Sequence, residues 1–249
     1  MPAAVKDPYE LRKLYKYLRV TDVADAMDGI GYFNIGFMST DLSPISPGTW
    51  FWGPAVTMRC VPSNRPMWKL NTTEEMVDVH RIWFKEVGVA SVDKFVKPGC
   101  VIITDAGDSG EVGWWGSNNA LAMVAAGAVG IITDGYCRDT REVALQKTPV
   151  VCRKRGRPII PGRIMCIETQ TTVSCAGAQV RPGDMIGWDD DGGIAVPAEV
   201  AEEVAHHAIA VMLADMKGRR RLYERLKMTM DDTVDVAMAE AYYKELGAL

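Results

Sequence analysis

Apolar and polar residues alternate along this chain in blocks that are typical of buried strands followed by amphipathic helices. Short apolar runs predict strands over residues 54–61, 101–104, 129–133 and 150–152. Apolar residues at helical spacing predict helices over residues 9–18, 22–28, 72–87, 118–126, 140–146, 199–213 and 233–246. Because apolar strands and helices alternate from residue 101 onward, the pattern predicts an α/β fold with a mixed or parallel sheet covered by helices.

Polar residues at the predicted helix starts support these boundaries. Thr21 is the expected N-cap of the second helix, and Thr72 with Glu75 has the pattern of a capping box at the start of the third. One face of that third helix is expected to be buried, because it collects the apolar side chains of Val79, Ile82, Trp83 and Val87.

One sequence pattern occurs twice. VKPGCVIITDAGDSG, from Val96, is similar to VRPGDMIGWDDDGG, from Val180. Each copy predicts a turn, a strand and an acidic glycine-rich loop, which begins at Asp105 in the first copy and at Asp189 in the second. Two explanations remain open, a strand-initiating turn used twice or an internal duplication. Either explanation places carboxylates at strand ends, where α/β proteins commonly have their sites.

Length and charge exclude several classes of protein. With 249 residues and 48% hydrophobic content, the chain can bury a large core, and no segment resembles a linker, so one domain over residues 1–249 is expected. The formal net charge of −4 lacks the basic field of a dedicated nucleic-acid binder, so nucleic acid is not an expected partner.

Cysteines and apolar runs bear on the cellular compartment. The six cysteines are dispersed without a C-x-x-C pair, which argues against a disulfide scaffold or a structural zinc site and favours a reducing cytoplasm. The N-terminal sequence lacks the apolar core of a signal peptide, and no run of about 18 apolar residues occurs, so no association with a membrane is expected.

Candidate chemistry is concentrated between Asp105 and Arg141. Seven glycines lie in this segment, and a predicted helix begins just after Gly116. Glycines before a helix let backbone N–H groups approach an anion, which the helix N-terminus also attracts. The alternative is a glycine-rich turn packed closely against a neighbouring helix. No Walker A lysine and no G-x-G-x-x-G after a strand is present, so nucleotide binding is a weak reading.

Arg138 and Asp139 follow the predicted strand at 129–133 and a turn at Gly135, so both can project from the end of the sheet. A guanidinium binds a carboxylate through two hydrogen bonds, and an adjacent carboxylate can hold a hydrated hard cation beside the same ligand. The alternative is structural: Asp139 caps the following helix and Arg138 lies on the surface.

The segment GSNNALAMVAAGAVGIITDGYCRD, which ends at Asp139, resembles the glycine-rich motif of the RraA-like family, whose hallmark is an acidic residue, twenty intervening residues and Arg-Asp. RPGDMIGWDDDGGIAVP is similar to the second motif of that family, and TDVADAM and GPAVTM also match. The resemblance covers roughly residues 20–225, with an insertion around 63–71 and an added C-terminal helix. This family includes 4-hydroxy-4-methyl-2-oxoglutarate aldolase, also described as 4-carboxy-4-hydroxy-2-oxoadipate aldolase.

The resemblance implies a β/β/α swivelling-type core with N- and C-terminal helices, assembled as homotrimers or homohexamers with sites between subunits. It implies a class II pyruvate aldolase in which Arg138 binds the carboxylate of the pyruvyl group and Asp139 holds Mg2+ or Mn2+ largely through water. Backbone groups beside them are expected to complete the substrate site, at Gly116, Ser117, Asn118 and Asn119.

This sequence departs from the family pattern at Ser117, which stands where the family has its acidic residue. Serine cannot contribute charge to the water shell of a metal. Other carboxylates are candidates to compensate, namely Asp105, Asp108, Glu111, Asp189 and Asp191. The family also contributes a glutamate from a later helix at the subunit interface, and the corresponding position here falls near Asp215.

Two tryptophans and two basic clusters remain. Trp114 and Trp115 either wall a pocket against an apolar part of the substrate or pack inside the protein or its interface. The clusters at 153–157 (RKRGR) and 217–221 (KGRRR) could contact RNA or an acidic partner, although runs of this length are usually solvated faces.

The preferred function is therefore a carbon–carbon lyase that cleaves a 4-hydroxy-2-oxo acid to pyruvate and a second keto acid. Oxaloacetate decarboxylation is an expected side activity, because both reactions pass through the pyruvate enolate. Two alternatives remain open: a ring-shaped, non-catalytic modulator of an RNA-degrading enzyme, and a lyase with a changed substrate on the same scaffold. Retention of both Arg138 and Asp139 favours an enzyme.

Overall fold

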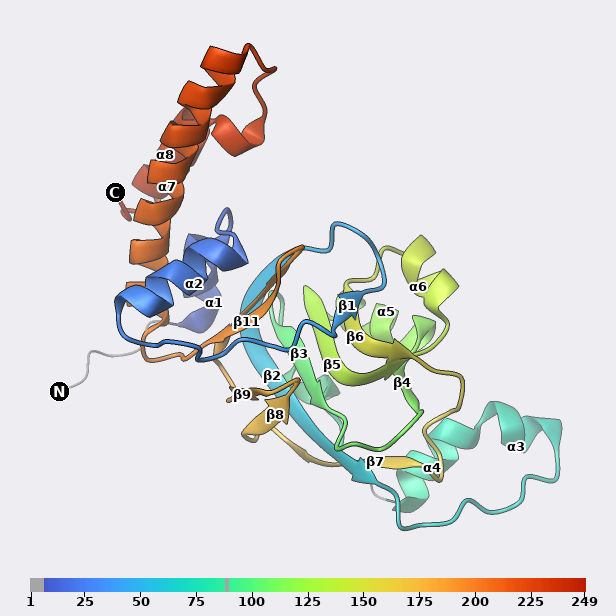
Figure 1. Cartoon of the computed structure of the whole chain (residues 1–249). Coiled ribbons are helices and arrows are strands. Elements are labelled where there is room, and N and C mark those ends of the chain that lie inside the picture. The colour runs from blue at the N-terminus through green and yellow to red at the C-terminus, as the bar shows by residue number, and fades with distance from the viewer. Residues whose placement is uncertain (1–6, 88–89) are drawn as a thin grey trace.

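A curved mixed sheet forms the centre of the computed structural model, which describes residues 7–87 and 90–249 (Figure 1). Within these residues nine strands belong to this sheet, and seven of them follow the order β1-β6-β5-β3-β2-β10-β11. Their bounds are β1 Ser43–Pro44, β2 Phe51–Pro62, β3 Val101–Asp105, β4 Gly113–Trp115, β5 Gly130–Cys137, β6 Val150–Arg155, β7 Ile164–Thr169, β10 Met185–Asp189 and β11 Gly192–Val196. β4 pairs with β5, and β7 pairs with β2. The predicted α/β fold is confirmed, and β2, β3, β5 and β6 run parallel.

Two layers cover the parallel strands, because successive strand residues face opposite sides of the sheet. Ile102 of β3 belongs to a core that also contains residues of helices α5 (Ser117–Ala125) and α6 (Thr140–Leu145). Its neighbour Ile103 belongs to a second core with the hairpin of β8 (Val173–Cys175) and β9 (Ala178–Val180). Both isoleucines are fully buried, which explains the uninterrupted apolar sequence of this strand.

Helices from the two ends of the chain form a third core. They are α1 (Pro8–Leu11), the 3-10 helix Arg12–Tyr15, α2 (Val20–Gly29), α7 (Ala201–Leu226) and α8 (Val236–Glu245). The 3-10 helix Asp232–Val234 lies between α7 and α8 in the chain. Tyr15 is buried in this core and donates a hydrogen bond to the carbonyl of Ala201 at 2.6 Å. The far parts of α7 and α8 stand away from the sheet (Figure 1).

Three predicted helix boundaries differ from those in the structure. The helix expected over 9–18 is a short α-helix followed by a 3-10 helix. Thr21 is not an N-cap: Arg19 holds that position, because its backbone N–H donates to the Asp22 carboxylate at 2.9 Å. The helix expected over 199–213 continues to Leu226 and includes the second basic cluster.

The helix expected over 72–87 consists of two helices, α3 (Thr73–Val77) and α4 (Val79–Val87). Thr72 caps α3 as predicted, accepting a hydrogen bond from the Glu75 N–H at 3.1 Å. Val79 and Trp83 are the buried residues of α4. These two helices lie at one end of the molecule, away from α7 and α8 (Figure 1).

The repeated sequence pattern forms two strands on opposite sides of β2. β3 runs parallel to β2 and brings Asp105 opposite Arg59 near one end of β2. β10 runs antiparallel, so Trp188 lies opposite Phe51 and Asp189 lies at the other end. The two acidic loops therefore do not meet.

The six cysteines are all buried and free. In the part of the chain that the structure describes, no helix has both the length and the apolar character needed to cross a membrane.

Candidate functional site

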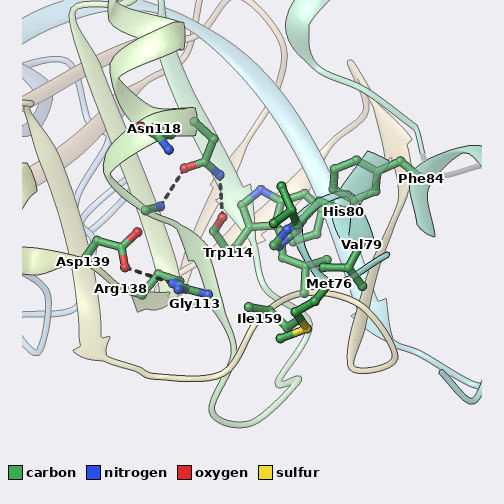
Figure 2. A pocket seen from close by; sticks show the side chains of 14 residues that line it. Met76, Val79, His80, Phe84, Gly113, Trp114, Asn118, Arg138, Asp139 and Ile159 are labelled. Atoms are coloured by element: carbon green, nitrogen blue, oxygen red, sulfur yellow. Dashed lines mark hydrogen bonds and ion pairs between the residues drawn. The ribbon is translucent and has the colours of Figure 1, made fainter. Parts of the chain in front are cut away.

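A cavity of about 470 Å3 lies between the end of β5 and the helices α3 and α4 (Figure 2). Its charged end is formed by Arg138 and Asp139. Gly113, Gly116, Asn118 and Asn119 lie beside this pair. The rest of the lining is formed by Met76, Val77, Val79, His80, Phe84, Trp114, Ile159 and Ile160.

Backbone geometry holds Arg138 and Asp139 at the junction of β5 and α6. The Arg138 N–H donates to the carbonyl of Trp115 at 2.8 Å, which ties the residue to β4. Asp139 has a φ of 53° in the left-handed region and precedes α6, whose Val143 N–H donates to the Asp139 carbonyl at 3.0 Å. The backbone of Asp139 therefore forms the turn between β5 and α6, and its side chain lines the cavity.

The two side chains form an ion pair that stays accessible to solvent. Arg138 Nε donates to Asp139 Oδ1 at 3.1 Å, and the side chains are 30% and 36% exposed. The other carboxylate oxygen, Oδ2, accepts longer hydrogen bonds from the N–H of Ser117 at 3.3 Å and from its hydroxyl at 3.5 Å. Among the described residues, neither terminal nitrogen of Arg138 has a hydrogen-bond partner, so both can meet a ligand.

Two glycines make room for this pair. A Cβ on Gly113 would lie 2.7 Å from the Cβ of Arg138, and a Cβ on Gly116 would lie 2.7 Å from Asp139 Oδ2. Close packing thus explains glycine at both positions, although the neighbours are the side chains of Arg138 and Asp139 and not the helix that the structural alternative predicted. The Gly116 N–H already donates to the Asn119 side chain at 2.7 Å, and the Ser117 N–H donates to Asp139. These two amides are therefore engaged within the chain.

The predicted site residues around α5 have different positions. Asn118 lines the cavity. Asn119 also lines it, but its amide nitrogen donates to the Trp114 carbonyl at 2.7 Å, so it fixes the start of α5 on β4. Trp114 is a wall of the cavity, whereas Trp115 is buried and donates from its indole N–H to the Thr104 hydroxyl at 3.0 Å. Trp114 thus has the predicted role of a pocket wall, and Trp115 has the alternative role of packing inside the protein.

Sequence reasoning missed His80, which lies on α4 and faces the cavity between Trp114 and Phe84 (Figure 2). Its ring centroid is 6.2 Å from that of Phe84, one helical turn further on. Burial, and then the positive charge of Arg138, lowers the pKa of His80, so the imidazole is neutral near pH 7. No motif marks this histidine, and only its place on an amphipathic helix could have drawn attention to it.

Among the carboxylates expected to support the site, Glu111 does not line the cavity. It accepts two hydrogen bonds from the Arg157 guanidinium, at 2.8 and 2.9 Å, and this pairing lowers its pKa. Asp105 accepts from the N–H groups of Gly107 and Ser174, and Asp108 is likewise absent from the lining.

The other expected carboxylates lie in a different part of the fold. Asp189 is buried and accepts from the N–H groups of Val20 at 2.7 Å and Asp191 at 2.9 Å, and its burial raises its pKa. Asp215 on α7 pairs with Arg19 at 3.0 Å. None of these three carboxylates lines the cavity of Arg138 within one chain.

The atoms that could meet a metal are hard oxygens, but they are few. In residues 7–87 and 90–249, no group of three or more His, Cys, Asp or Glu side chains could hold a metal ion. Asp139 offers one accessible carboxylate beside the Ser117 hydroxyl. Such a site suits a cation that keeps most of its water, as Mg2+ does, and does not suit a metal that needs a complete protein ligand set.

Comparison with known proteins agrees with the motif around Arg138. The RraA-like family, described as Aldolase/RraA, matches residues 20–195. The chain belongs to the RraA-like family. A Halalkalibacterium halodurans protein named "Putative 4-hydroxy-4-methyl-2-oxoglutarate aldolase" is 25% identical over 197 residues, which are 78% of this chain and 80% of that protein.

Other RraA-like relatives differ in length. The protein DlpA of Legionella pneumophila is 23% identical over 194 residues, 78% of this chain but 28% of that protein. An uncharacterized Methanocaldococcus jannaschii protein is 29% identical over 116 residues, 45% of this chain and 53% of that protein. The chain thus spans about a quarter of the first relative and about half of the second.

Solved structures share the RraA-like fold. Streptomyces coelicolor RraAS2, described as an unusual member of the RNase ES inhibitor RraA protein family, has a TM-score of 0.68 at 21% identity, covering 84% of this chain and 96% of that one. An uncharacterized Pseudomonas syringae protein has a TM-score of 0.66 at 22% identity, covering 92% and 96%. At these identities the similarity is one of fold.

Proposed function

We propose that this RraA-like protein is a carbon–carbon lyase that cleaves a 4-hydroxy-2-oxo acid to pyruvate and a second carbonyl compound. The observation that carries the proposal is the pair Arg138 and Asp139, adjacent and accessible at the charged end of a 470 Å3 cavity. The names of several relatives at 25–32% identity support the same class of reaction.

Arg138 binds the carboxylate of the substrate in this proposal. Its Nε is held by Asp139, so the guanidinium is fixed in one plane with its terminal nitrogens toward the cavity. A planar guanidinium binds a carboxylate through two parallel hydrogen bonds, which also fixes the direction of the bond to be broken.

Asp139, with the Ser117 hydroxyl beside it, would hold Mg2+ or Mn2+ through water. The cation, when bound, supplies positive charge next to the 2-keto group, where negative charge develops as the carbon–carbon bond breaks. The carboxylate of Asp139 has a second role that needs no metal, because it keeps Arg138 from swinging into solvent.

Assembly as a homotrimer or homohexamer belongs to this proposal. Phe33, Ile35, Phe37 and Trp50 are large apolar residues that are exposed in one chain. Phe37 forms a bridge to Ile194 of β11, the strand at one end of the sheet order. An exposed apolar group beside a sheet edge is typical of a surface covered by a neighbour. Light scattering should give a mass of at least three chains, and a 27 kDa monomer at working concentration would contradict this.

The function is tested by measuring pyruvate release from 4-hydroxy-2-oxo acids and from oxaloacetate, with Mg2+ and after EDTA treatment. We expect turnover with Mg2+, loss on chelation and recovery when Mg2+ returns, because a largely hydrated cation binds weakly. Full activity after exhaustive chelation would contradict the metal requirement. Absence of pyruvate release from every substrate would favour the alternative of a non-catalytic modulator of an RNA-degrading enzyme.

A further inference from the structure

The two ends of the cavity differ in chemistry. The side chains of the apolar end indicate which kind of substrate group fits there. Met76 on α3 and Phe84 on α4 line the cavity, yet they are 54% and 37% exposed. Ile159 faces them from the segment after β6 (Figure 2). Large apolar side chains that border a cavity and meet water favour an apolar ligand group, which would remove that surface from water.

The apolar end contains no fixed positive charge. Among the described residues that line the cavity, Arg138 is the only arginine or lysine. Arg163 lies near the other side of the Ile159 wall, and its Nη1 donates to the carbonyls of Ile159 at 3.2 Å and Pro161 at 3.4 Å. A second carboxylate on the substrate would therefore enter an apolar region in which the described residues of this chain offer no cation to meet it.

His80 does not change this conclusion. Among the described residues it is the one titratable side chain on the α4 side of the cavity, and burial, together with the positive charge of Arg138, lowers its pKa. A neutral imidazole can donate or accept one hydrogen bond, which suits a hydroxyl or a carbonyl but gives a carboxylate no charge.

The apolar end is formed before any ligand binds. Trp83 on α4 is fully buried and stacks on Trp68, with ring centroids 6.0 Å apart. Val79, also on α4, is buried at the back of the cavity. Because α4 is fixed by these buried residues, Phe84 borders a preformed space, whereas Met76 lies on α3, which has no buried residue of its own.

We propose that the site takes 2-oxo acids with a single carboxylate, whose fourth carbon carries an uncharged apolar group, aromatic or branched, packed between Met76, Phe84 and Ile159. This inference rests on the proposed lyase function and specifies its substrate class. Arg138 binds the only carboxylate, and the apolar group extends toward α4.

The reaction is balanced without a further co-reactant. The bond between the third and fourth carbons breaks, and its electron pair stays on the third carbon to give the pyruvate enolate. The 4-hydroxyl loses its proton and becomes the carbonyl of the released aldehyde or ketone. The third carbon then takes up a proton to give pyruvate. For 4-hydroxy-2-oxo-4-phenylbutanoate, the products are pyruvate and benzaldehyde.

The first test measures binding without turnover. Isothermal titration calorimetry on the full chain with Mg2+ compares two acids that lack the 4-hydroxyl, 2-oxo-4-phenylbutanoate and 2-oxoglutarate. We expect the phenyl compound to bind at least about 10-fold more tightly, because the second carboxylate of 2-oxoglutarate has no cationic partner. Equal or tighter binding of 2-oxoglutarate, or no binding of either acid, would overturn the inference.

Variants of one wall residue make the test specific. Met76→Ala should reduce the preference for the phenyl compound several-fold, and Met76→Arg should reverse it by adding a cation to the wall. Met228→Ala is the matched control, since Met228 is 47% exposed and lies outside the cavity. If Met76→Arg leaves the preference unchanged, the apolar group does not lie against α3 and the inference is wrong.

A second test separates this inference from the lyase function. Pyruvate release is compared for 4-hydroxy-2-oxo-4-phenylbutanoate and 4-hydroxy-4-methyl-2-oxoglutarate. Faster turnover of the phenyl substrate supports both proposals. Faster turnover of the dicarboxylate supports the lyase and overturns the substrate class. Selective binding of the phenyl acid without pyruvate release from any substrate refutes the lyase and leaves the apolar site in place.

Discussion

The two ends of the cavity are built in different ways. At the charged end, Arg138 and Asp139 come from one strand–helix junction and are fixed by neighbours on β4 and α5. At the apolar end, Met76 and Phe84 come from two helices of the long connection between β2 and β3. Short-range geometry therefore determines the first end, and tertiary packing determines the second.

This difference assigns separate tasks to the two ends. In the proposed function, the charged end supplies a cation for the carboxylate of a 2-oxo acid and a carboxylate for a hydrated metal. The apolar end would then distinguish one such acid from another. Changes at the charged end should therefore affect every substrate, whereas changes at the apolar end should affect the choice among substrates.

The largest effects are expected at Arg138 and Asp139. Arg138→Ala should lower kcat/KM for all substrates by roughly 30-fold to several thousand-fold, because a charged hydrogen-bonding partner of the substrate is lost. Arg138→Lys should recover only part of this, since lysine keeps the charge without the planar fork. Asp139→Asn should lose turnover that depends on Mg2+ while keeping the fold, because asparagine tolerates the left-handed backbone.

Steady-state kinetics of pyruvate release, with circular dichroism to verify folding, measures these effects. Near wild-type kcat/KM in folded Arg138→Ala and Asp139→Asn would show that the charged end is not the reacting end.

A smaller loss is expected from Gly116→Ala. The new Cβ would lie 2.7 Å from Asp139 Oδ2, so the carboxylate must move away from its present position. A displacement on the order of 1 Å at a reacting group can cost about 100-fold in rate. Gly218→Ala is the matched control, because Gly218 lies in α7 with nothing within 4 Å of its added Cβ. Equal kcat/KM in both variants would argue against a fixed position of Asp139.

A modest effect of pH is expected at His80. Its pKa in the folded protein lies below the ordinary value of 6.5, so the unfolded chain takes up the proton first as the pH falls. The contribution of neutral His80 to the free energy of unfolding is thus present above the unfolded pKa and is lost as the pH falls from there toward the folded pKa. His80→Gln should remove this part of the acid sensitivity.

Urea unfolding of the wild type and of His80→Gln between pH 7.5 and about pH 5 would measure the difference. Parallel curves for the two proteins would mean that His80 titrates as it does in water.

The smallest effect is expected from Glu111→Gln. Glu111 pairs with Arg157, which is 89% exposed, and neither residue lines the cavity. An exposed ion pair contributes little, so kcat/KM and Tm should both stay close to the wild-type values. A large loss of kcat/KM with Tm unchanged would mean that Glu111 also belongs to the charged end of the site.

The sequence predicted the charged end better than the apolar end. Glycine spacing and the Arg-Asp pair are local features, and the two helices around them form close to where the apolar pattern placed them. The strand expected over 129–133 is longer, because β5 continues through the predicted turn at Gly135 to Cys137. His80 lies on a helix that the pattern also predicted. Its position against Arg138 depends on where that helix packs, which local patterns do not determine.

Strand direction explains the other main difference. Asp189 resembles Asp105 in its local sequence, but β10 runs antiparallel to β2 and β3 runs parallel. Two equal motifs therefore end at opposite ends of one strand. Direction within a sheet is a tertiary property, so the repeated motif alone could not show that the two carboxylates lie at opposite ends of β2.

Position 139 meets two requirements, a left-handed backbone conformation and a charged side chain in the cavity. Its φ of 53° restricts the position to residues that tolerate this conformation, chiefly glycine, asparagine and aspartate. Of these three, aspartate alone carries charge, and asparagine satisfies the turn equally well. In another sequence of this fold, either aspartate or asparagine at this position would satisfy the turn. Only aspartate would also supply a negative charge. If Asp139 has its proposed role, the exchange of one oxygen for an NH2 group at residue 139 would remove the chemistry of the site and leave the architecture in place.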